Sequence, residues 1–269
     1  MNELNANTFK EIIVKENKGV LTLRFNRPQK KNAMNLALVN EVIDVFDAIT
    51  QLPDIRVVVI EGCDGHFCSG GDISDMHLSS LAPEQRERTI WQFNRRFGEM
   101  ITKVDNATAV VIAVLEGAVL GGGFGVACVA DLTLANQSAY FALPETSLGL
   151  IPAQIAPFVA KRIGLHQAKR LALTGEQLSF SQAQALGLVH YTFEEAHRER
   201  EKTALIEKVK HCAPSANALT KQLLRDIEHQ PLTALLDHAA TLFVQSLTSK
   251  EGTEGTRAFV EKRTPYWCK

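Results

Sequence analysis

Residues 114–132 read VLEGAVLGGGFGVACVADL, and the glycines at positions 121, 122, 123 and 125 are the most unusual feature of the chain. Glycine has low helix propensity, yet the flanking residues are apolar and indicate buried regular structure. The pattern predicts a strand over 110–115, a bend over 117–120 and a buried helix from the glycine run onward. A backbone left bare at such a point indicates a close approach by another group.

Two familiar explanations for the glycine run do not fit. The dinucleotide fingerprint G-x-G-x-x-G would need its last glycine at Val126 or Cys128, and the G-K-[ST] ending of a P-loop is missing. Packing of membrane helices is a second explanation, because residues 109–130 contain only one charge, Glu116. The strand, bend and helix signals contradict one continuous membrane-spanning helix.

A second glycine-rich loop, residues 65–72, reads GHFCSGGD and follows another apolar strand predicted over 57–60. A helix predicted over 83–104 comes after it, so the order of strand, glycine loop and helix occurs twice. Two such loops can bring two backbone N–H groups to one point. That arrangement stabilises an oxygen that gains negative charge during a reaction. For either loop alone, tight packing remains an equally valid explanation of the glycines.

The rest of the chain predicts an α/β core followed by a helical tail, without a low-complexity linker. An antiparallel pair of strands is expected at 9–16 and 20–26, and a helix at 36–51 with Asn35 as its N-cap. Further strands are expected at 132–135 and 139–142. Beyond residue 153 the strand signals fade, and helices are expected around 161–174, 215–228, 232–247 and 252–262.

Charge and cysteine content exclude several classes of protein. The 29 basic and 30 acidic residues give a formal net charge of -1, so no general attraction to nucleic acid or to an anionic membrane is expected. An anionic ligand would need local positive charge. The five cysteines are odd in number and lack C-x-x-C spacing, which argues against a disulfide framework or a zinc site. No metal is expected, and the reducing cytoplasm is the expected location, because the N-terminal residues also lack an apolar signal core.

Four segments of the chain resemble the enoyl-CoA hydratase/isomerase (crotonase) family in their order and spacing. They are HFCSGGDI at 66–73, GAVLGGGFG at 117–125, FALPETSLGLIP at 141–152 and AFVEKRTPYW at 258–267. The resemblance implies a crotonase-type spiral of β-β-α turns over residues 1–200 and a helical trimerisation region over 201–269. It also implies a homotrimer, or a hexamer built as a dimer of trimers. The ligand implied is a coenzyme A thioester, with no separate cofactor because coenzyme A is part of the substrate.

The resemblance assigns the thioester oxygen to the backbone N–H groups of Gly71 and Gly122, where an enolate would be stabilised. Hydratases of the family commonly use two glutamates. Glu145 matches the second of these positions, and it follows a proline in an apolar context, where partial burial would raise its pKa to a useful value. The first position is occupied by Gly125, which has no side chain to transfer a proton.

With a single matching glutamate, the chain resembles the branch of the family that acts on branched, 3-substituted glutaconyl-CoA. Isohexenylglutaconyl-CoA, from acyclic terpene breakdown, is the expected substrate, and methylglutaconyl-CoA is the alternative. The substrate's own carboxylate would help to position the water. A single-glutamate isomerase, a decarboxylase and a non-catalytic acyl-CoA or RNA-binding scaffold remain alternatives. Gln154 is a candidate donor to the distal carboxylate unless it is merely exposed at a helix start, while Ile155 and Phe158 are candidates for an apolar channel.

Residues for the coenzyme also follow from the resemblance. Lys30, Lys31 and Ala33 lie in the loop expected beside the pantetheine and phosphates. Asp72 and Ile73 follow the first oxyanion glycine. A last pair of candidates, Phe259 and Lys262, is predicted to share one face of the final helix and to reach the coenzyme, often that of a neighbouring subunit.

Four further residues are weaker candidates. Glu116 and Asp75 could supply a second catalytic carboxylate, although Glu116 could equally belong to a buried ion pair. His66 lies near the first glycine loop and is more typical of a structural loop residue. Cys68 has no histidine and acid beside it in the sequence to make it a nucleophile.

Overall fold

A computed structural model describes residues 9–72 and 82–268 of the chain. Nine strands form two sheets among these residues, a six-stranded sheet of order β1-β2-β3-β4-β6-β9 and a three-stranded sheet of order β5-β7-β8. The strand bounds are β1 Ile12–Asn17, β2 Val20–Phe25, β3 Val57–Gly62, β4 Val110–Leu115, β5 Ala118–Leu120, β6 Leu132–Ala135, β7 Tyr140–Ala142, β8 Leu178–Ser179 and β9 Tyr191–Thr192.

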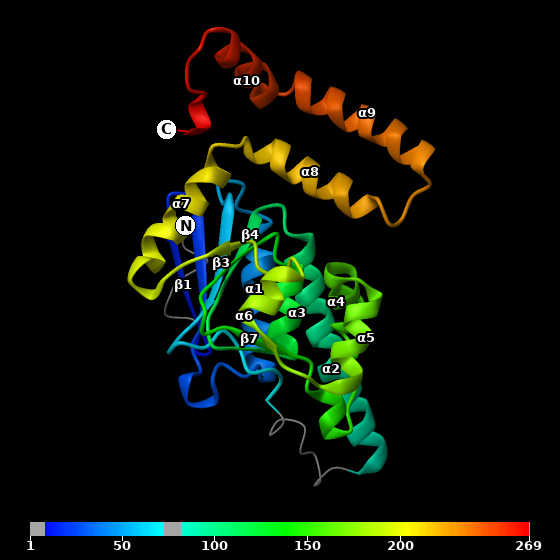
Figure 1. The fold of residues 1–269 in the computed structure, drawn as a ribbon. Coiled ribbons are helices and arrows are strands. Elements are labelled where there is room, and N and C mark those ends of the chain that lie inside the picture. Colours follow the sequence, from blue (N-terminus) through cyan, green and yellow to red (C-terminus); the bar gives the residue numbers. More distant parts are fainter. Residues whose placement is uncertain (1–8, 73–81, 269) are drawn as a thin grey trace.

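The helices surround these sheets and then continue as a separate group towards the C-terminus (Figure 1). Their bounds are α1 Leu36–Ile49, α2 Pro83–Asn106, α3 Gly122–Val129, α4 Ala156–Ile163, α5 Leu165–Thr174, α6 Phe180–Ala185, α7 Arg198–Lys210, α8 Pro214–Asp226, α9 Leu232–Thr248 and α10 Lys250–Val260. Short 3-10 helices are η1 Pro28–Lys30, η3 Glu145–Leu148, η4 Glu195–His197 and η5 Tyr266–Cys268.

The six-stranded sheet is covered on both faces. β1 and β2 pair antiparallel, whereas β2, β3, β4, β6 and β9 are parallel neighbours. Side chains alternate along a strand, so Val58 and Ile60 of β3 join the core shared with α1, α2 and α3. Val57 and Val59 face the other way and pack with Leu205 of α7. Burial on both faces explains the continuous apolar runs of the parallel strands.

Several local predictions are confirmed. The two N-terminal strands form a hairpin, and Asn35 caps α1 by accepting a hydrogen bond from the backbone N–H of Leu38 at 2.8 Å. The strand predicted over 110–115 has those bounds. The segment predicted as a bend after β4 is different, because only Gly117 bends, with φ of 51°, and the next three residues form β5.

The helical tail also departs from expectation at three points. The helix expected over 161–174 is two helices, α4 and α5, which meet at Gly164. The two-residue strands β8 and β9 lie where no strand was predicted. Helices α6 and α7 were not predicted either. Strands this short are set by pairing with distant segments, which local pattern does not reveal.

Helices α8, α9 and α10 lie together to one side of the sheets (Figure 1). The predicted division at residue 200 falls inside α7, which packs on the six-stranded sheet, and the division itself stays a prediction. Large apolar side chains on α9 are exposed, among them Leu236, Phe243 and Val244. Within the described ranges, none of the helices has the length and apolar character needed to cross a membrane.

Candidate active site

The two glycine loops lie side by side. The segment after β3 runs parallel to β5, with an isolated bridge between Cys68 and Val119. The N–H of Cys68 donates to the carbonyl of Ala118 at 2.8 Å, and the N–H of Leu120 donates to the carbonyl of Cys68 at 2.9 Å. Each loop therefore begins where two neighbouring extended segments end. This pairing brings the two loops together, because Gly70 and Leu120 occupy the ends of adjacent segments.

Gly71 and Gly122 both line one cavity, and the strand bridge at one and the helix start at the other leave each backbone N–H outside the regular hydrogen bonding of its own element. Gly71 bridges to Met34, whose N–H donates to the carbonyl of Gly70 at 2.8 Å and whose carbonyl accepts from the N–H of Asp72 at 2.9 Å. In such a parallel bridge the N–H of the central residue, Gly71, points away from its partner strand. Gly122 is the first residue of α3, where an N–H has no acceptor within the helix. The helix N-terminus also contributes positive potential at this point.

Two glycines of the run are required by the site itself. Gly121 has φ of 48°, a left-handed conformation that disfavours other residues. A Cβ atom added there would lie 2.7 Å from Oε1 of Glu145. At Gly122 an added Cβ would lie 3.0 Å from the ring of Phe97, close to the cavity wall. The bare backbone thus leaves room for a carboxylate on one side and an aromatic ring on the other.

The other two glycines of the run are explained by packing. A Cβ at Gly123 would lie 2.6 Å from the Cβ of Cys68, so α3 can approach the first glycine loop only without a side chain. At Gly125 a Cβ would collide with the side chain of Ile155. The position where family hydratases have their first glutamate is therefore filled by an isoleucine from another segment.

Glu145 begins η3, directly after Pro144. Its Oε2 atom is buried and has no hydrogen-bond partner among the residues that the structure describes. Burial raises the pKa of this carboxyl, and no cation offsets the effect. A carboxyl held in this way can be protonated closer to neutral pH than an exposed one, which suits a group that both donates and accepts a proton.

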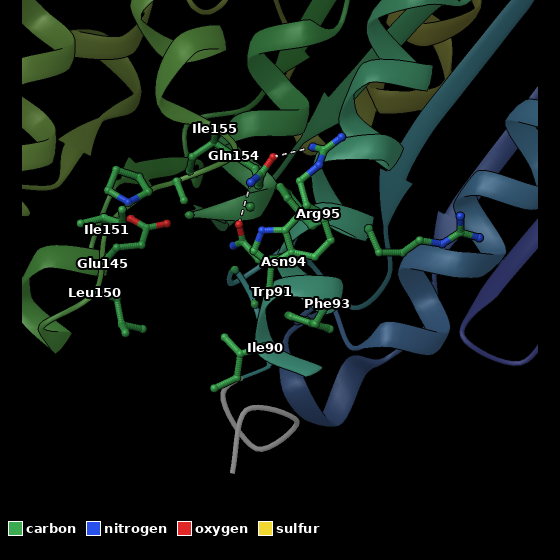
Figure 2. A pocket seen from close by; sticks show the side chains of 18 of the residues that line it. Ile90, Trp91, Phe93, Asn94, Arg95, Glu145, Leu150, Ile151, Gln154 and Ile155 are labelled. Atoms are coloured by element: carbon green, nitrogen blue, oxygen red, sulfur yellow. Dashed lines mark hydrogen bonds between the residues drawn. The ribbon is translucent and has the colours of Figure 1, made fainter. Parts of the chain in front are cut away.

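Glu145, Gly71 and Gly122 line one cavity of about 1080 Å³. Figure 2 shows Glu145 at this cavity. An apolar wall is formed by exposed side chains of α2, of the end of η3 and of the segment after it, namely Ile90, Trp91, Leu148, Leu150 and Ile151. Of the described residues around the cavity, the acidic ones are Glu145 and Glu87. Glu87, an exposed residue of α2, was not a candidate from the sequence because nothing local distinguishes it from a solvated helix residue.

Gln154 lies in the cavity wall, but its polar atoms already have partners. Its Nε2 donates to Oδ1 of Asn94 at 2.7 Å, and its Oε1 accepts from Nη1 of Arg95 at 3.0 Å. The side chain is half-buried, so it is not simply exposed at a helix start. Ile155 lines the cavity as expected, whereas Phe158 packs against the main core and is not part of the cavity wall.

The loop that contains Lys30 and Lys31 is fixed to the first glycine loop. The N–H of Ser69 donates to the carbonyl of Lys31 at 3.0 Å, and the hydroxyl of Ser69 donates to the carbonyl of Lys30 at 3.0 Å. Both lysines are exposed, beside the first glycine loop. The sequence reading missed Asn32, a fully buried residue whose Nδ2 donates to the carbonyls of Cys63 and His66.

The other predicted coenzyme residues have mixed outcomes. Ala33 is buried, and its carbonyl accepts a hydrogen bond from the guanidinium of Arg27. Asp72 is also buried and pairs with Arg27 at 2.9 Å, so its carboxylate serves the loop structure. Ile73 lies outside the described residues.

Phe259 and Lys262 are not part of the cavity wall in this chain. Phe259 lies on α10, and Lys262 follows that helix, at the end of the molecule away from α2 (Figure 1). Phe259 is 84% exposed. If these two residues contribute to a coenzyme site, that site belongs to another subunit.

The weaker candidates are resolved by their contacts. Glu116 is ion-paired with Arg198 at 3.0 Å and is not among the residues that line the cavity, which supports one of its two alternatives, a buried ion pair. Nδ1 of His66 accepts from the N–H of Ala118 at 3.1 Å, a structural contact. Burial raises the pKa of Cys68 to about 12, which leaves the thiol unreactive. Asp75 lies outside the described residues.

Comparisons with known proteins agree on one family. The family model described as enoyl-CoA hydratase/isomerase matches residues 15–269. The chain is 31% identical to 2,3-dehydroadipyl-CoA hydratase of Escherichia coli K12, over 95% of this chain and 97% of that protein. It is 30% identical to a peroxisomal Δ(3,5)-Δ(2,4)-dienoyl-CoA isomerase of Arabidopsis thaliana, over 96% of each chain.

Solved structures share the fold at higher identity. AtuE of Pseudomonas aeruginosa superposes with a TM-score of 0.92 at 46% identity, covering 97% of this chain and all of the other. An enoyl-CoA hydratase/isomerase from Marinobacter aquaeolei gives a TM-score of 0.92 at 45% identity, covering 96% of this chain and 99% of the other.

Proposed function

Because the chain belongs to the enoyl-CoA hydratase/isomerase family and is an enzyme of the hydratase type, we propose that it hydrates a branched, 3-substituted glutaconyl-CoA thioester. The expected crotonase fold is confirmed by the structural matches, and an acyl-CoA substrate is consistent with the family. Isohexenylglutaconyl-CoA is the proposed substrate, with methylglutaconyl-CoA as the alternative. Both candidate substrates belong to one acyl class, the 3-substituted glutaconyl thioesters, which is the class that the sequence motifs indicate.

One observation supports this function above all others. A half-buried glutamate, whose Oε2 is buried without a hydrogen-bond partner among the described residues, shares a cavity with Gly71 and Gly122 from two separate loops. In the proposed reaction the thioester carbonyl accepts hydrogen bonds from Gly71 and Gly122. Water adds its oxygen to C3, and the electrons of the double bond move to the thioester as an enolate. The N–H groups stabilise the enolate oxygen, an effect worth about 2.7–4 kcal/mol for each donor at the transition state.

Glu145 is the proposed proton carrier of this reaction. It takes a proton from the attacking water and delivers one to C2, so the carboxyl is unchanged at the end. Its raised pKa supports both steps, because the protonated and ionised forms become closer in free energy near neutral pH. The substrate's own distal carboxylate would help by holding the attacking water in position.

The acyl class is supported by the shape and chemistry of the cavity. The apolar wall beside Trp91 and Leu150 suits a hydrocarbon branch, and the polar group around Gln154 suits the distal carboxylate of a glutaconyl chain. The relative named for 2,3-dehydroadipyl-CoA takes its name from an acyl group that also ends in a carboxylate. A substrate with both an apolar branch and a second carboxylate would use both parts of the wall.

A single-glutamate isomerase is the second candidate, and Gly125 favours it. The space where a second family glutamate would lie is occupied by Ile155, and one relative is a dienoyl-CoA isomerase by name. Glu87 is the other carboxylate on the cavity wall, so the Glu87→Gln variant tests for a second acid.

Coenzyme binding and assembly form a further part of the proposal. Lys30 and Lys31 would hold the phosphates, and Phe259 and Lys262 would reach the coenzyme of a neighbouring subunit. The exposed apolar face of α9 and α10 supports a homotrimer, or a hexamer made of two trimers. Sedimentation should then show one of these species, and an active monomer would contradict the proposal. The cytoplasmic location stays a prediction from the cysteine pattern.

Isotope labelling tests the reaction directly. The purified protein is incubated with isohexenylglutaconyl-CoA or methylglutaconyl-CoA in water enriched in heavy oxygen, and the products are analysed by mass spectrometry. A labelled product heavier by one water supports hydration. An unlabelled product of unchanged mass would identify an isomerase, and loss of carbon dioxide would identify a decarboxylase.

A further inference from the structure

Three polar side chains form a connected chain on the cavity wall opposite Glu145. Figure 2 shows Gln154 between Asn94 and Arg95, with hydrogen bonds to both, and Glu145 across the open space. Asn94 and Arg95 are neighbours on α2, whereas Gln154 comes from the segment before α4. Of the three, only Gln154 was a candidate from the sequence.

The direction of hydrogen bonding in this chain is fixed by Arg95. A guanidinium can only donate, so Gln154 must turn its oxygen towards Arg95 and its NH2 group towards Asn94. Asn94 then accepts through Oδ1, and its own NH2 group is left with two hydrogens to donate. The donor-only chemistry of Arg95 therefore fixes the orientation of both amides. The free polar atoms at this point of the wall are therefore donors.

The contact depends on a glycine in α2. At Gly98, which is buried, an added Cβ would collide with Oε1 of Gln154 and lie 2.5 Å from Nη1 of Arg95. Glycine inside a helix costs about 0.5–1 kcal/mol relative to alanine. The glycine at position 98 leaves the space in which Gln154 and Arg95 meet. A larger residue there would prevent their hydrogen bond, so this contact depends on Gly98.

The charge on Arg95 is also unusual. Among the described residues, no carboxylate forms an ion pair with Arg95. Arg96, the next residue, also lines the cavity but is paired with Glu99 at 2.7 Å and donates to Asn40 at 2.7 Å. Two adjacent arginines thus differ in one respect, because only Arg95 keeps an uncompensated positive charge beside the donors of Asn94.

We propose that Asn94 and Arg95, held in place by Gln154, form the subsite that selects an acyl group with a distal carboxylate. This proposal rests on the proposed function and assigns its specificity to named residues. Asn94 donates a hydrogen bond to the carboxylate, Arg95 supplies the positive charge, and Gln154 is a positioning residue that keeps both donors turned outward. An uncharged acyl chain would leave this donor group without an acceptor, which costs binding energy.

Binding of unreactive thioesters tests the subsite without any catalytic step. Glutaryl-CoA and butyryl-CoA differ by one terminal carboxylate, and calorimetry gives the ratio of their dissociation constants for each protein. The wild-type protein should prefer glutaryl-CoA. Arg95→Gln should lower this preference by about 10- to 100-fold, the factor expected for a lost charge-assisted hydrogen bond. Asn94→Leu, which keeps the shape but removes the donors, should also lower it.

Arg96→Gln is the matched control, since it removes the same charge from the next position of α2, where Glu99 already neutralises it. This variant should keep the preference for glutaryl-CoA. The proposal would be overturned if wild type and Arg95→Gln showed the same preference for glutaryl-CoA over butyryl-CoA. It would also be overturned if Arg95→Gln and Arg96→Gln lowered that preference equally. A Gln154→Met variant should lower the preference while leaving the affinity for butyryl-CoA unchanged, as a positioning role requires.

Hydration assays separate this proposal from the proposed function. The rates with methylglutaconyl-CoA and 3-methylcrotonyl-CoA, which differ by the same carboxylate, are measured on the same variants. If neither thioester is hydrated but glutaryl-CoA is still preferred through Arg95, the hydratase assignment fails and the subsite stands. If both are hydrated with no difference between wild type and Arg95→Gln, the subsite fails and the hydratase assignment stands.

Discussion

Glu61 and Glu145 are two glutamates removed from water in opposite ways. Glu61 lies on β3 with its side chain fully buried, and it accepts hydrogen bonds from Arg24, Arg198 and Lys202 at 2.8, 3.0 and 3.2 Å. Burial alone would raise the pKa of Glu61, but the three cations together lower it. Burial raises the pKa of Glu145 with no cation to oppose it. The difference in partners, not the residue type, separates the pKa of an ion-paired carboxylate from that of the proposed proton carrier.

The same comparison supports a structural role for Glu116. Burial raises the pKa of its carboxyl, as at Glu145, but Arg198 holds it in the ion-pair network that also contains Glu61. Arg198 begins α7, so this network attaches that helix to the sheet. A raised pKa identifies a catalytic group here only when the carboxyl also faces the cavity.

The largest expected effect is the loss of proton transfer at Glu145. Glu145→Gln keeps the shape of the side chain but cannot exchange a proton, so kcat should fall by about 10²–10⁴-fold with little change in KM. The free energy of unfolding should be almost unchanged, because no ion pair is lost. Steady-state kinetics and denaturant unfolding measure the two effects. Activity above about a tenth of wild type would move the proton carrier elsewhere, with Glu87 the first residue to test.

Glu61→Gln should give the opposite result. The change leaves buried cations without their shared carboxylate, and breaking a buried pair costs about 3–5 kcal/mol. Arg198 and Lys202 keep Glu116 and Glu199 as partners, so a loss of about 3 kcal/mol is expected. Turnover per folded molecule should stay near that of wild type. A large loss of turnover in a folded Glu61→Gln protein would mean that the network also positions the active site.

This pair of residues also marks what the sequence can predict. Glu145, Gly71 and Gly122 could be chosen from the sequence because their motifs resemble those of the family, and the structure places all three at one cavity, while their chemical roles stay predictions. Two of the three partners of Glu61, Arg198 and Lys202, lie 137 and 141 residues away, on a helix that the pattern did not predict. The hydrogen bonds of Gln154 likewise depend on the packing of α2 against the segment before α4, which local sequence does not encode.

A third test asks whether the position of the Glu145 carboxylate matters as much as its chemistry. In Gly121→Ala the new methyl group would lie 2.7 Å from Oε1 of Glu145 and must displace it. A displacement of about 1 Å can cost about 10²-fold in rate, so kcat should fall by roughly that factor. Gly65→Ala is the control, since Gly65 also has positive φ, 70°, but an added Cβ meets no atom within 4 Å. Similar kinetics for both alanine variants would show that backbone strain alone explains the loss.

The smallest effects concern how the free energy of unfolding depends on pH. The contributions of Glu145 and Glu61 should change with pH in opposite directions. The pKa of Glu145 is raised in the folded protein, so this group stabilises the fold below its ordinary value of 4.5, and the contribution is lost as pH rises from 4.5 through the folded pKa. The pKa of Glu61 is lowered, so its contribution is present above 4.5 and is lost as pH falls through the folded pKa.

Unfolding by denaturant at several pH values on both sides of 4.5 measures the two contributions as differences from each glutamine variant. The stability of wild type relative to Glu145→Gln should decrease with rising pH above 4.5. Relative to Glu61→Gln, it should increase with rising pH below 4.5 and then level off. Two difference curves with the same slope would contradict the contrast, because they would show that partners do not set the two carboxyl groups apart. Opposite slopes in separate pH ranges would tie one buried carboxylate to the stability of the fold and leave the other available for chemistry.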